Sequence, residues 1–182
     1  MNEMKLPAGE LDKYKPMDEA RLDRLLQDEI RKNRTKFVVL DDDPTGVQTV
    51  HGVSVYTDWS EGYMKEGLLD GNKIFYVLTN SRGMTEEGTT QIHDQIMTSV
   101  AEASAETGIA YQFISRSDST LRGHYPLETE LLRDGTEKAG RKIDGEILCP
   151  FFKEGGRYTI GNIHYVRYGE ALIPAAETEF AK

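Results

Sequence analysis

The sequence has little cysteine, few adjacent basic residues and no long apolar run, and each absence excludes a class of protein. Its 182 residues include one cysteine, Cys149, which excludes an internal disulfide framework and a cysteine-based zinc site. No run of Lys or Arg exceeds two residues and the net charge is −9, so neither nucleic acid nor an anionic membrane is an expected partner. No apolar run approaches the roughly 18 residues of a membrane-spanning helix. The first 16 residues also lack the apolar core of a signal peptide. We therefore expect a soluble, cytoplasmic protein.

Nucleotide-binding and hydrolase motifs are also missing. The chain contains no Walker-type phosphate loop, no dinucleotide-binding glycine fingerprint and no Gly-x-Ser-x-Gly elbow. The histidines at positions 51, 93, 124 and 164 are scattered without the spacing of metal ligands, so no metal site is expected. These residues by themselves predict no nucleotide site.

Short apolar runs that end abruptly at polar residues predict the strands. They occupy residues 37–40, 74–78, 110–114 and 146–149, with a further short strand at 52–56. Four apolar residues without alternation are typical of a strand that is buried on both faces of a parallel sheet.

Helical patterns alternate with these runs. One helix is expected after Asp18, with Leu22, Leu25, Leu26 and Ile30 on a single apolar stripe. Others are expected over residues 85–107, ending at Gly108, and over 127–139. This alternation predicts an α/β fold, with an open, mostly parallel sheet and helices on both faces.

The two ends of the chain differ from this middle part. Residues 1–35 read as an irregular arm followed by the first helix, and residues 36–182 read as the main domain. Residues 158–168 are rich in strand-forming residues and predict a C-terminal β-rich arm. Residues 175–182 begin a helical pattern without a stop signal, so we expect a further domain to follow.

Polar side chains gather where the predicted strands end. Ligands of open α/β sheets bind beyond the carboxyl ends of the strands, so these side chains are expected to meet at one edge. Arginines bind a carboxylate or a phosphate, and aspartates accept hydrogen bonds from hydroxyls. The pattern predicts a ligand that has one acid group and several hydroxyls. The strand-end residues are Asp41, Asp42, Asp43, Asn80, Ser81, Arg82, Arg116, Ser117, Asp118, Ser119, Thr120, Arg122 and Arg157.

Simpler interpretations stay open for several of these segments. Residues 41–44 are also typical of a solvated turn, residues 79–83 of a helix cap, and residues 155–157 of a flexible glycine turn. The segment 116–123 is harder to explain in this way, because it combines hydroxyls, an acid and two arginines with Gly123, which permits close backbone approach.

Four segments together resemble a known family. They are Val39-Leu40-Asp41-Asp42-Asp43-Pro44-Thr45-Gly46, Asn80-Ser81-Arg82, Asp118-Ser119-Thr120-Leu121-Arg122-Gly123, and Cys149-Pro150 followed by Gly156-Arg157-Tyr158-Thr159. In this order they resemble the N-terminal, sugar-binding domain of the four-carbon acid sugar kinases, over about residues 36 to 182. Three positions depart from the family's usual pattern: Asp41, Pro44 and Arg116 stand where a small, an aliphatic and a lysine residue are common.

The resemblance implies an activity, a substrate class and partners. Such kinases use ATP, with Mg²⁺, to phosphorylate threonate, erythronate or 3-dehydrotetronate on the terminal hydroxyl. Their C-terminal domain binds the nucleotide, which would explain why no phosphate loop occurs in this chain. The implied partners are the small acid sugar and the protein's own C-terminal domain, and a homo-oligomer is left open.

The resemblance also implies which residues form the site. The substrate-binding residues would be Asp42, Asp43, Ser81, Arg82, Arg116, Asp118, Ser119, Thr120, Arg122, Gly123 and Arg157. We expect an arginine to bind the substrate carboxylate and the acids to position its hydroxyls. Asp42, Asp43 and Asp118 are the candidates for a catalytic acid, although phosphoryl transfer depends mainly on positioning and does not require a strong base. The isolated chain is expected to bind sugar acid weakly and to show no kinase turnover.

Two other functions are compatible with parts of the sequence. The spacing Asp41-x-Asp43-x-Thr45 after an apolar run matches the first motif of haloacid-dehalogenase-type phosphatases, with Asp41 as nucleophile and Asp43 as acid/base. The later acidic pair that such an enzyme needs for Mg²⁺ is not found after Cys149. A noncatalytic module that senses a sugar acid would use the same strand-end residues.

Overall fold

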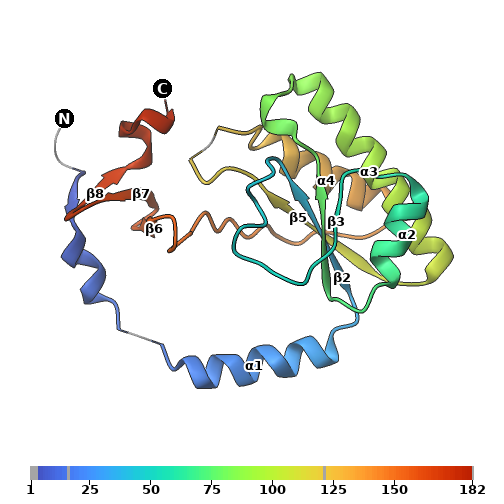
Figure 1. Cartoon of the computed structure of the whole chain (residues 1–182), viewed down its shortest axis with the longest axis horizontal. Coiled ribbons are helices and arrows are strands. Elements are labelled where there is room, and N and C mark those ends of the chain that lie inside the picture. Colours follow the sequence, from blue (N-terminus) through green and yellow to red (C-terminus); the bar gives the residue numbers. More distant parts are fainter. Residues whose placement is uncertain (1–3, 16, 121, 182) are drawn as a thin grey trace. The chain divides into compact units, whose positions relative to one another are not determined.

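The computed structural model describes residues 4–15, 17–120 and 122–181, and it divides into two compact units (Figure 1). The first, which we call the parallel-sheet unit, comprises residues 25–117 and 123–146. The second, the hairpin unit, comprises residues 1–24, 118–122 and 147–182.

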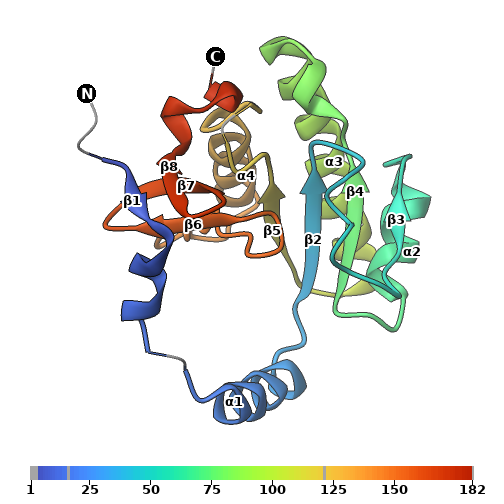
Figure 2. The same cartoon turned by 60° about the vertical axis from the view of Figure 1, so that its left-hand side comes forward.

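The parallel-sheet unit is built on a four-stranded sheet (Figure 2). Its strands are β2 (Lys36–Asp41), β3 (Val55–Tyr56), β4 (Ile74–Leu78) and β5 (Tyr111–Arg116). They lie in the order β3-β4-β2-β5 and every neighbouring pair is parallel. The expected strands at 37–40, 74–78 and 110–114 are confirmed, whereas the run at 52–56 pairs only over its last two residues.

The expectation of a strand at residues 146–149 is wrong. This segment has no strand partner in the described part of the chain, and Ile147 is 94% exposed. A short apolar run becomes a strand only where a neighbouring backbone supplies its hydrogen bonds, and the apolar pattern carries no information about that partner.

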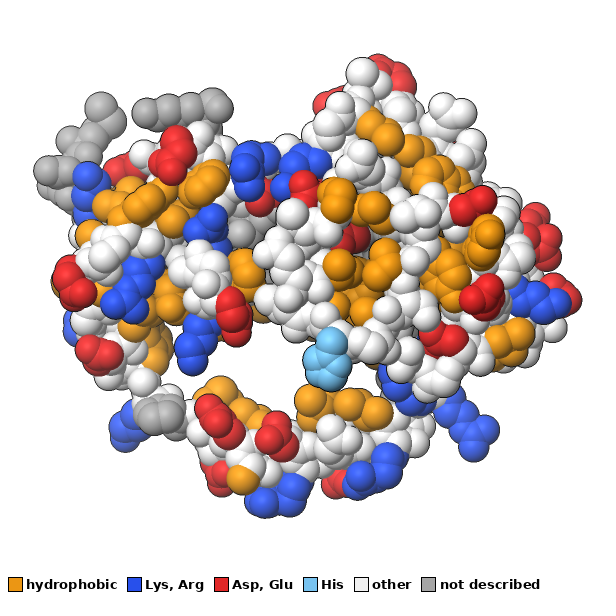
Figure 3. All heavy atoms as spheres, in the orientation of Figure 1, with side chains coloured by type: hydrophobic (Ala, Val, Ile, Leu, Met, Phe, Trp, Pro, Cys, Tyr) orange, Lys and Arg blue, Asp and Glu red, His pale blue; other side chains and the backbone are white. Residues whose placement is uncertain are grey.

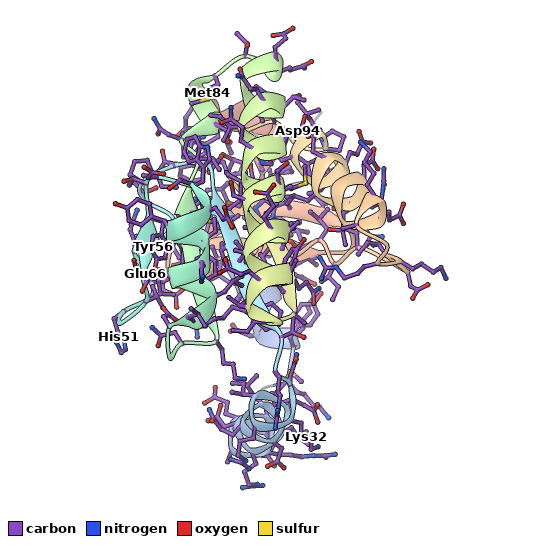
Figure 4. The ribbon with its side chains drawn as sticks, turned by 90° about the vertical axis from the view of Figure 1, so that its right-hand side faces the viewer. Lys32, His51, Tyr56, Glu66, Met84 and Asp94 are labelled. Carbon is purple, nitrogen blue, oxygen red and sulfur yellow. The ribbon has the colours of Figure 1, made fainter. Side chains whose placement is uncertain are left out.

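Three helices cover this sheet: α2 (Glu61–Leu69), α3 (Glu86–Thr107) and α4 (Leu127–Lys138). Helix α3 has the ends that the sequence predicted. The Thr85 hydroxyl accepts a hydrogen bond from the amide of Gly88 at 3.2 Å, and Gly108 ends the helix with a φ of 70°. Figure 4 shows α2, α3 and α4 side by side in one layer, with Tyr56 of β3 next to Glu66 of α2.

The core lies between this helical layer and one face of the sheet. Alternate strand residues, Val38 and Leu40 on β2 and Phe75 and Val77 on β4, point into it. The helices contribute Met64, Leu68, Ile96, Val100, Ala103 and Leu132. Burying several large side chains in one cluster is the main stabilising contribution in a unit of this size.

The helices expected on both faces of the sheet lie on one face in the described residues of this unit. The crossovers β3-α2-β4 and β4-α3-β5 advance in the same direction across the sheet, so right-handed crossovers place both helices on the same side. The connection that runs back from β2 to β3, residues 42–54, contains no helix.

The hairpin unit is an antiparallel sheet of four strands. They are β1 (Leu6–Pro7), β6 (Arg157–Ile160), β7 (Ile163–Tyr168) and β8 (Ala171–Pro174), in the order β1-β8-β7-β6. Gly161 and Asn162 join β6 to β7 with φ of 54° and 67°, which is a two-residue turn suited to the twist of a hairpin. The C-terminal β-rich region is thus confirmed.

Two expectations for the chain ends are wrong. The N-terminal arm is not wholly irregular, because β1 pairs with β8 and a 3-10 helix follows at Ala8–Lys13. Residues 175–181 form two 3-10 turns, Ala175–Glu177 and Glu179–Ala181, in place of an α-helix. Residues 1–3, 16 and 182 lie outside the described residues.

Helix α1 (Glu19–Lys32) forms where it was expected, but its apolar stripe is not covered. Among the described residues, none in α1 is buried, and Leu25 and Leu26 are about half exposed. In Figure 3 its apolar side chains gather along one side of the helix. The same figure shows acidic and basic side chains interspersed over this face of the molecule.

Candidate functional site

Carboxylates and guanidinium groups meet at the carboxyl edge of the parallel sheet. We call this group the strand-end cluster: Asp41, Asp42, Asp43, Arg82, Arg116 and Ser117. Backbone pairing places Asp41, the last residue of β2, opposite Arg116, the last residue of β5. The Ser81–Gly83 turn follows β4, and the amide of Arg82 donates to the carbonyl of Asp42 at 3.2 Å. The sheet register therefore assembles a cluster whose members are far apart in the sequence.

The strongest contact in the cluster joins Asp42 to Arg82. Nε and Nη2 of Arg82 donate to the two carboxylate oxygens of Asp42 at 3.0 and 2.8 Å, which is a bidentate pair. The Asp42 side chain is 1% exposed, and the Ser117 hydroxyl donates to its Oδ2 at 3.2 Å. Arg82 also contacts Asp43, with Nη1 lying 3.1 Å from Oδ2. Arg82 is thus shared by two adjacent carboxylates.

Arg116 makes looser contacts with the same acids. Its Nη1 lies 3.4 Å from Oδ1 of Asp41 and 3.6 Å from Oδ1 of Asp42, and its side chain is 31% exposed. Charge-assisted hydrogen bonds are typically about 2.7–2.9 Å, so Arg116 is incompletely engaged by these partners. A guanidinium in this position is the natural contact for an added anion.

Asp41 is buried beneath the loop that follows it. A Cβ built on Gly46 would lie 1.9 Å from Oδ2 of Asp41, so the glycine backbone covers this carboxylate directly. Burial raises the pKa of Asp41 to about 6, against the opposing effect of Arg116. A carboxyl group so covered does not favour the phosphatase hypothesis, in which Asp41 must attack a phosphate ester.

Asp43 has the opposite environment. Its Oδ1 accepts hydrogen bonds from the hydroxyl of Thr45 and, at 2.8 Å, from the amide of Thr45. The hydroxyl contact lowers the pKa of Asp43, with Arg82 acting in the same direction. Asp43 is therefore an ionised, partly exposed acceptor next to a buried pair.

Gly123 provides room for this arrangement. A Cβ at this position would lie 2.3 Å from the hydroxyl of Ser117 and 2.9 Å from Oδ2 of Asp42. Any side chain here would push against the two groups that fix the Asp42 carboxylate. Close approach accounts for the glycine, as the segment 116–123 suggested.

Ser81 points away from the cluster and into the protein. It is fully buried, and its hydroxyl donates to Oε1 of Glu128 at 2.7 Å while lying 2.9 Å from the hydroxyl of Thr79. Of the predicted Ser-Arg pair, only Arg82 lies in the cluster. Glu128 carried no recognisable signal in the sequence, because it is one of several acids on an amphipathic helix.

Asp118, Ser119, Thr120 and Arg122 belong to the hairpin unit. Asp118 accepts from Nε and Nη2 of Arg122 at 2.9 and 3.0 Å and from the amide of Thr120 at 3.2 Å. Burial alone would raise the pKa of Asp118, but the hydrogen bonds from Arg122 and Thr120 outweigh it and hold the pKa well below its usual range. The most specific motif in the sequence thus forms a local ion pair. Leu121 lies outside the described residues.

Arg157 and Arg122 both contact an aromatic ring in this unit. Their guanidinium carbons lie 4.8 and 5.0 Å from the centre of the Phe180 ring. Arg157 also donates to the carbonyl of Gly155 at 2.7 Å. Burial and the charge of Arg157 lower the pKa of His164 nearby. Sequence reasoning identified Arg157 but had no signal for Phe180.

The strand-end residues do not fit a metal site of their own. Over residues 4–15, 17–120 and 122–181, no group of three or more His, Cys, Asp or Glu side chains is placed to hold a metal ion. Asp42 and Asp43 are taken up by Arg82. We therefore derive no step through Mg²⁺ or ATP for this chain. In the described residues, no helix is both long enough and apolar enough to span a membrane.

The chain was compared with curated proteins and with models of protein families. No curated protein matches the chain. A family model described as a sugar-binding N-terminal domain matches residues 37–182, which covers both the strand-end cluster and the Asp118–Arg122 pair. The chain therefore belongs to the family of sugar-binding N-terminal domains of the four-carbon acid sugar kinases.

Proposed function

We propose that this chain binds the substrate of an ATP-dependent kinase that phosphorylates a four-carbon acid sugar on its terminal hydroxyl. The substrate is of the threonate, erythronate or 3-dehydrotetronate type. The observation that carries the proposal is the loosely engaged Arg116 beside the ionised, partly exposed Asp43 at the carboxyl edge of the sheet. One group suits the carboxylate of a sugar acid and the other suits its hydroxyls.

The remaining members of the cluster hold these two groups in place. Asp42 fixes Arg82 through the bidentate pair, and Arg82 in turn contacts Asp43. The buried carboxylates of Asp41 and Asp42 attract the Arg116 guanidinium and hold it at the sheet edge.

Other parts of the function rest on family membership. Ser119, Thr120, Asp118, Arg122, Gly123 and Arg157 remain proposed substrate-binding residues on that ground. ATP and Mg²⁺ are assigned to the protein's own C-terminal nucleotide-binding domain. No catalytic residue is singled out among Asp42, Asp43 and Asp118, because phosphoryl transfer relies on positioning and charge stabilisation.

Binding of four-carbon sugar acids to the chain tests the proposal. NMR titration with threonate and erythronate, carried into the millimolar range, should shift the amide resonances of the residues at the carboxyl ends of β2 and β5. Arg116→Ala should weaken binding by about tenfold or more, because a hydrogen bond to a charged group is lost. Arg133→Ala is the matched control, since Arg133 is an exposed arginine on α4 that pairs with Asp134.

Two results would contradict the proposal. One is unchanged affinity in Arg116→Ala. The other is the absence of sugar-acid shifts both in the chain and in a version joined to its nucleotide-binding domain. ATP-dependent phosphorylation by the 182-residue chain alone would contradict the assignment of nucleotide binding to the other domain.

A further inference from the structure

Five polar side chains are buried behind the strand-end cluster. We call Thr79, Ser81, Thr89, His93 and Glu128 the buried polar cluster. Each is at most 2% exposed. They come from the end of β4, the turn after it, α3 and the first turn of α4. So many polar groups in an interior require a reason, because each costs free energy to remove from water.

A chain of hydrogen bonds runs from Glu128 to the end of β2. Oε1 of Glu128 accepts from the Ser81 hydroxyl at 2.7 Å, and the amide of Ser81 donates to the hydroxyl oxygen of Thr79 at 3.4 Å. The hydroxyl of Thr79 in turn donates to the carbonyl of Asp41 at 3.0 Å. Helix α4 is thereby tied to the strand end that carries the acids.

Glu128 is poorly compensated for a buried carboxylate. In the described part of the chain it forms no ion pair, and its Oε2 has no hydrogen-bond partner. Glu128 lies in the first turn of α4, where the positive end of the helix dipole favours a carboxylate. Burial lowers the pKa of His93 nearby, although Glu128 acts in the opposite direction. An apolar side chain of similar size would avoid this cost, so stability alone does not account for the carboxylate.

The turn that Glu128 anchors also carries Arg82. Asn80 enters the turn in the left-handed conformation, with φ of 54°, and Ser81 directly precedes Arg82. Arg82 reaches Asp42 through a long side chain, which loses rotamer entropy when its guanidinium is held in one place. A fixed backbone at Arg82 limits the positions from which Nε and Nη2 can reach the two carboxylate oxygens of Asp42.

We infer that Glu128 is a positioning residue, which through the Ser81 hydroxyl fixes the Asn80–Gly83 turn and so holds Arg82 on Asp42. The role of Glu128 in holding Arg82 on Asp42 does not depend on any ligand. An effect of Glu128 on ligand binding rests on the proposed function, since it assumes that the Asp42–Arg82 pair supports the sugar-acid site.

The Nε–H group of Arg82 provides a direct measurement. It donates to Asp42 at 3.0 Å, so its proton should exchange slowly with water and give a distinct NMR signal, identified by its loss in Arg82→Lys. Ser81→Ala and Glu128→Leu should accelerate this exchange by about tenfold or more, which corresponds to the loss of one hydrogen bond. Glu128→Gln keeps an acceptor for Ser81, so its exchange rate should stay close to that of the parent.

Thr136→Val is the matched control. Thr136 is buried on the same helix, and its hydroxyl bonds only to the carbonyl of Leu132 among the described contacts. This variant should lower the melting temperature without changing the Arg82 signal. If Glu128→Leu does not fold, Ser81→Ala decides, because it removes a single oxygen atom.

The inference would be overturned if Ser81→Ala folds and the exchange rate of its Arg82 Nε proton equals that of the parent. It would also be overturned if this proton exchanges at the same rate in Thr136→Val and in Ser81→Ala. A parent protein with a protected Arg82 signal but no affinity for threonate or erythronate would instead count against the proposed function alone. In a parent that binds, Ser81→Ala should weaken sugar-acid affinity by a similar factor to the exchange effect, whereas Glu128→Gln should leave the affinity close to that of the parent.

Discussion

The two units each contain an aspartate–arginine pair, but they form these pairs in different ways. In the parallel-sheet unit Asp42 and Arg82 are 40 residues apart, and the carboxylate is almost fully buried. In the hairpin unit Asp118 and Arg122 are four residues apart, and the arginine side chain is 45% exposed. The first pair exists only because the sheet is assembled, whereas a short loop suffices for the second.

The surrounding cores differ in the same way. The parallel-sheet unit buries Phe75, Leu68 and Ile96 in one cluster between helices and strands. The hairpin unit buries fewer large side chains, chiefly Tyr165, Val166 and Leu172. We therefore expect the geometry of the strand-end cluster to depend on packing throughout its unit, and the Asp118 pair to depend mainly on its own loop.

The largest effect should come from removing the buried aspartate. Asp42→Ala should lower the free energy of unfolding by about 3–5 kcal/mol, because it leaves the Arg82 guanidinium without its bidentate partner in a partly buried place. Asp118→Ala should cost about 1 kcal/mol, since its arginine can turn to water. Urea denaturation followed by circular dichroism measures the first, and amide exchange in β7 measures the second. Equal losses would refute the contrast.

A second contrast concerns two glycines that are needed for different reasons. Gly123→Ala should cost about 1–3 kcal/mol, because its methyl group meets Ser117 and Asp42. Gly161→Ala should cost about 1–2 kcal/mol through its φ of 54° alone, since nothing lies within 4 Å of the added carbon.

Asparagine separates the two causes. Gly161→Asn should be nearly neutral, because asparagine tolerates the left-handed conformation, whereas Gly123→Asn should be worse than Gly123→Ala. Denaturation midpoints of the four variants give the comparison. A well-tolerated Gly123→Asn would show that space at Asp42 is not what requires the glycine.

The last contrast is a difference in pH dependence. Burial raises the pKa of Asp41 to about 6 from its ordinary 3.8, so its protonated form is stabilised on folding. That contribution is present below about pH 4 and is lost as the pH rises through about 6. Relative to Asp41→Asn, the parent should therefore become less stable over this interval.

Asp118 should behave in the opposite sense. Its pKa is lowered in the folded protein, so its contribution is present above its ordinary pKa and is lost as the pH falls below it. Relative to Asp118→Asn, the parent should lose stability below about pH 4. Denaturation of each matched pair across this range measures both effects, and parallel pH profiles for the two pairs would contradict the assigned environments.

Much of the fold was predictable where a local pattern carries the information. The runs at 37–40 and 74–78 are buried strands, and Thr85 and Gly108 bound α3 as helix-capping residues do. The run at 146–149 has the same pattern but no strand partner, and the stripe on α1 is not covered. Hydrophobicity predicts a tendency to be buried, but it does not say what is available to cover the segment.

The candidate site shows the same limit. The sequence identified the acids after β2 and the arginines after β4 and β5, because strand ends are where open sheets bind ligands. It assigned Ser81 to the ligand, but the fold turns this hydroxyl inward to Glu128. The residue types alone do not show which side chains of a short turn point toward the ligand and which point into the protein.

By itself, the sequence determined the class of the fold, the family and the charged residues at the strand ends, because each of these is recorded in local patterns or in the order of short motifs. Only the tertiary structure decided which charges pair, which aspartate is buried and protonates most readily, and that Glu128 lies behind Arg82. Pairing and desolvation depend on distances between segments tens of residues apart, and these distances exist only after the sheet register and the helix packing are set.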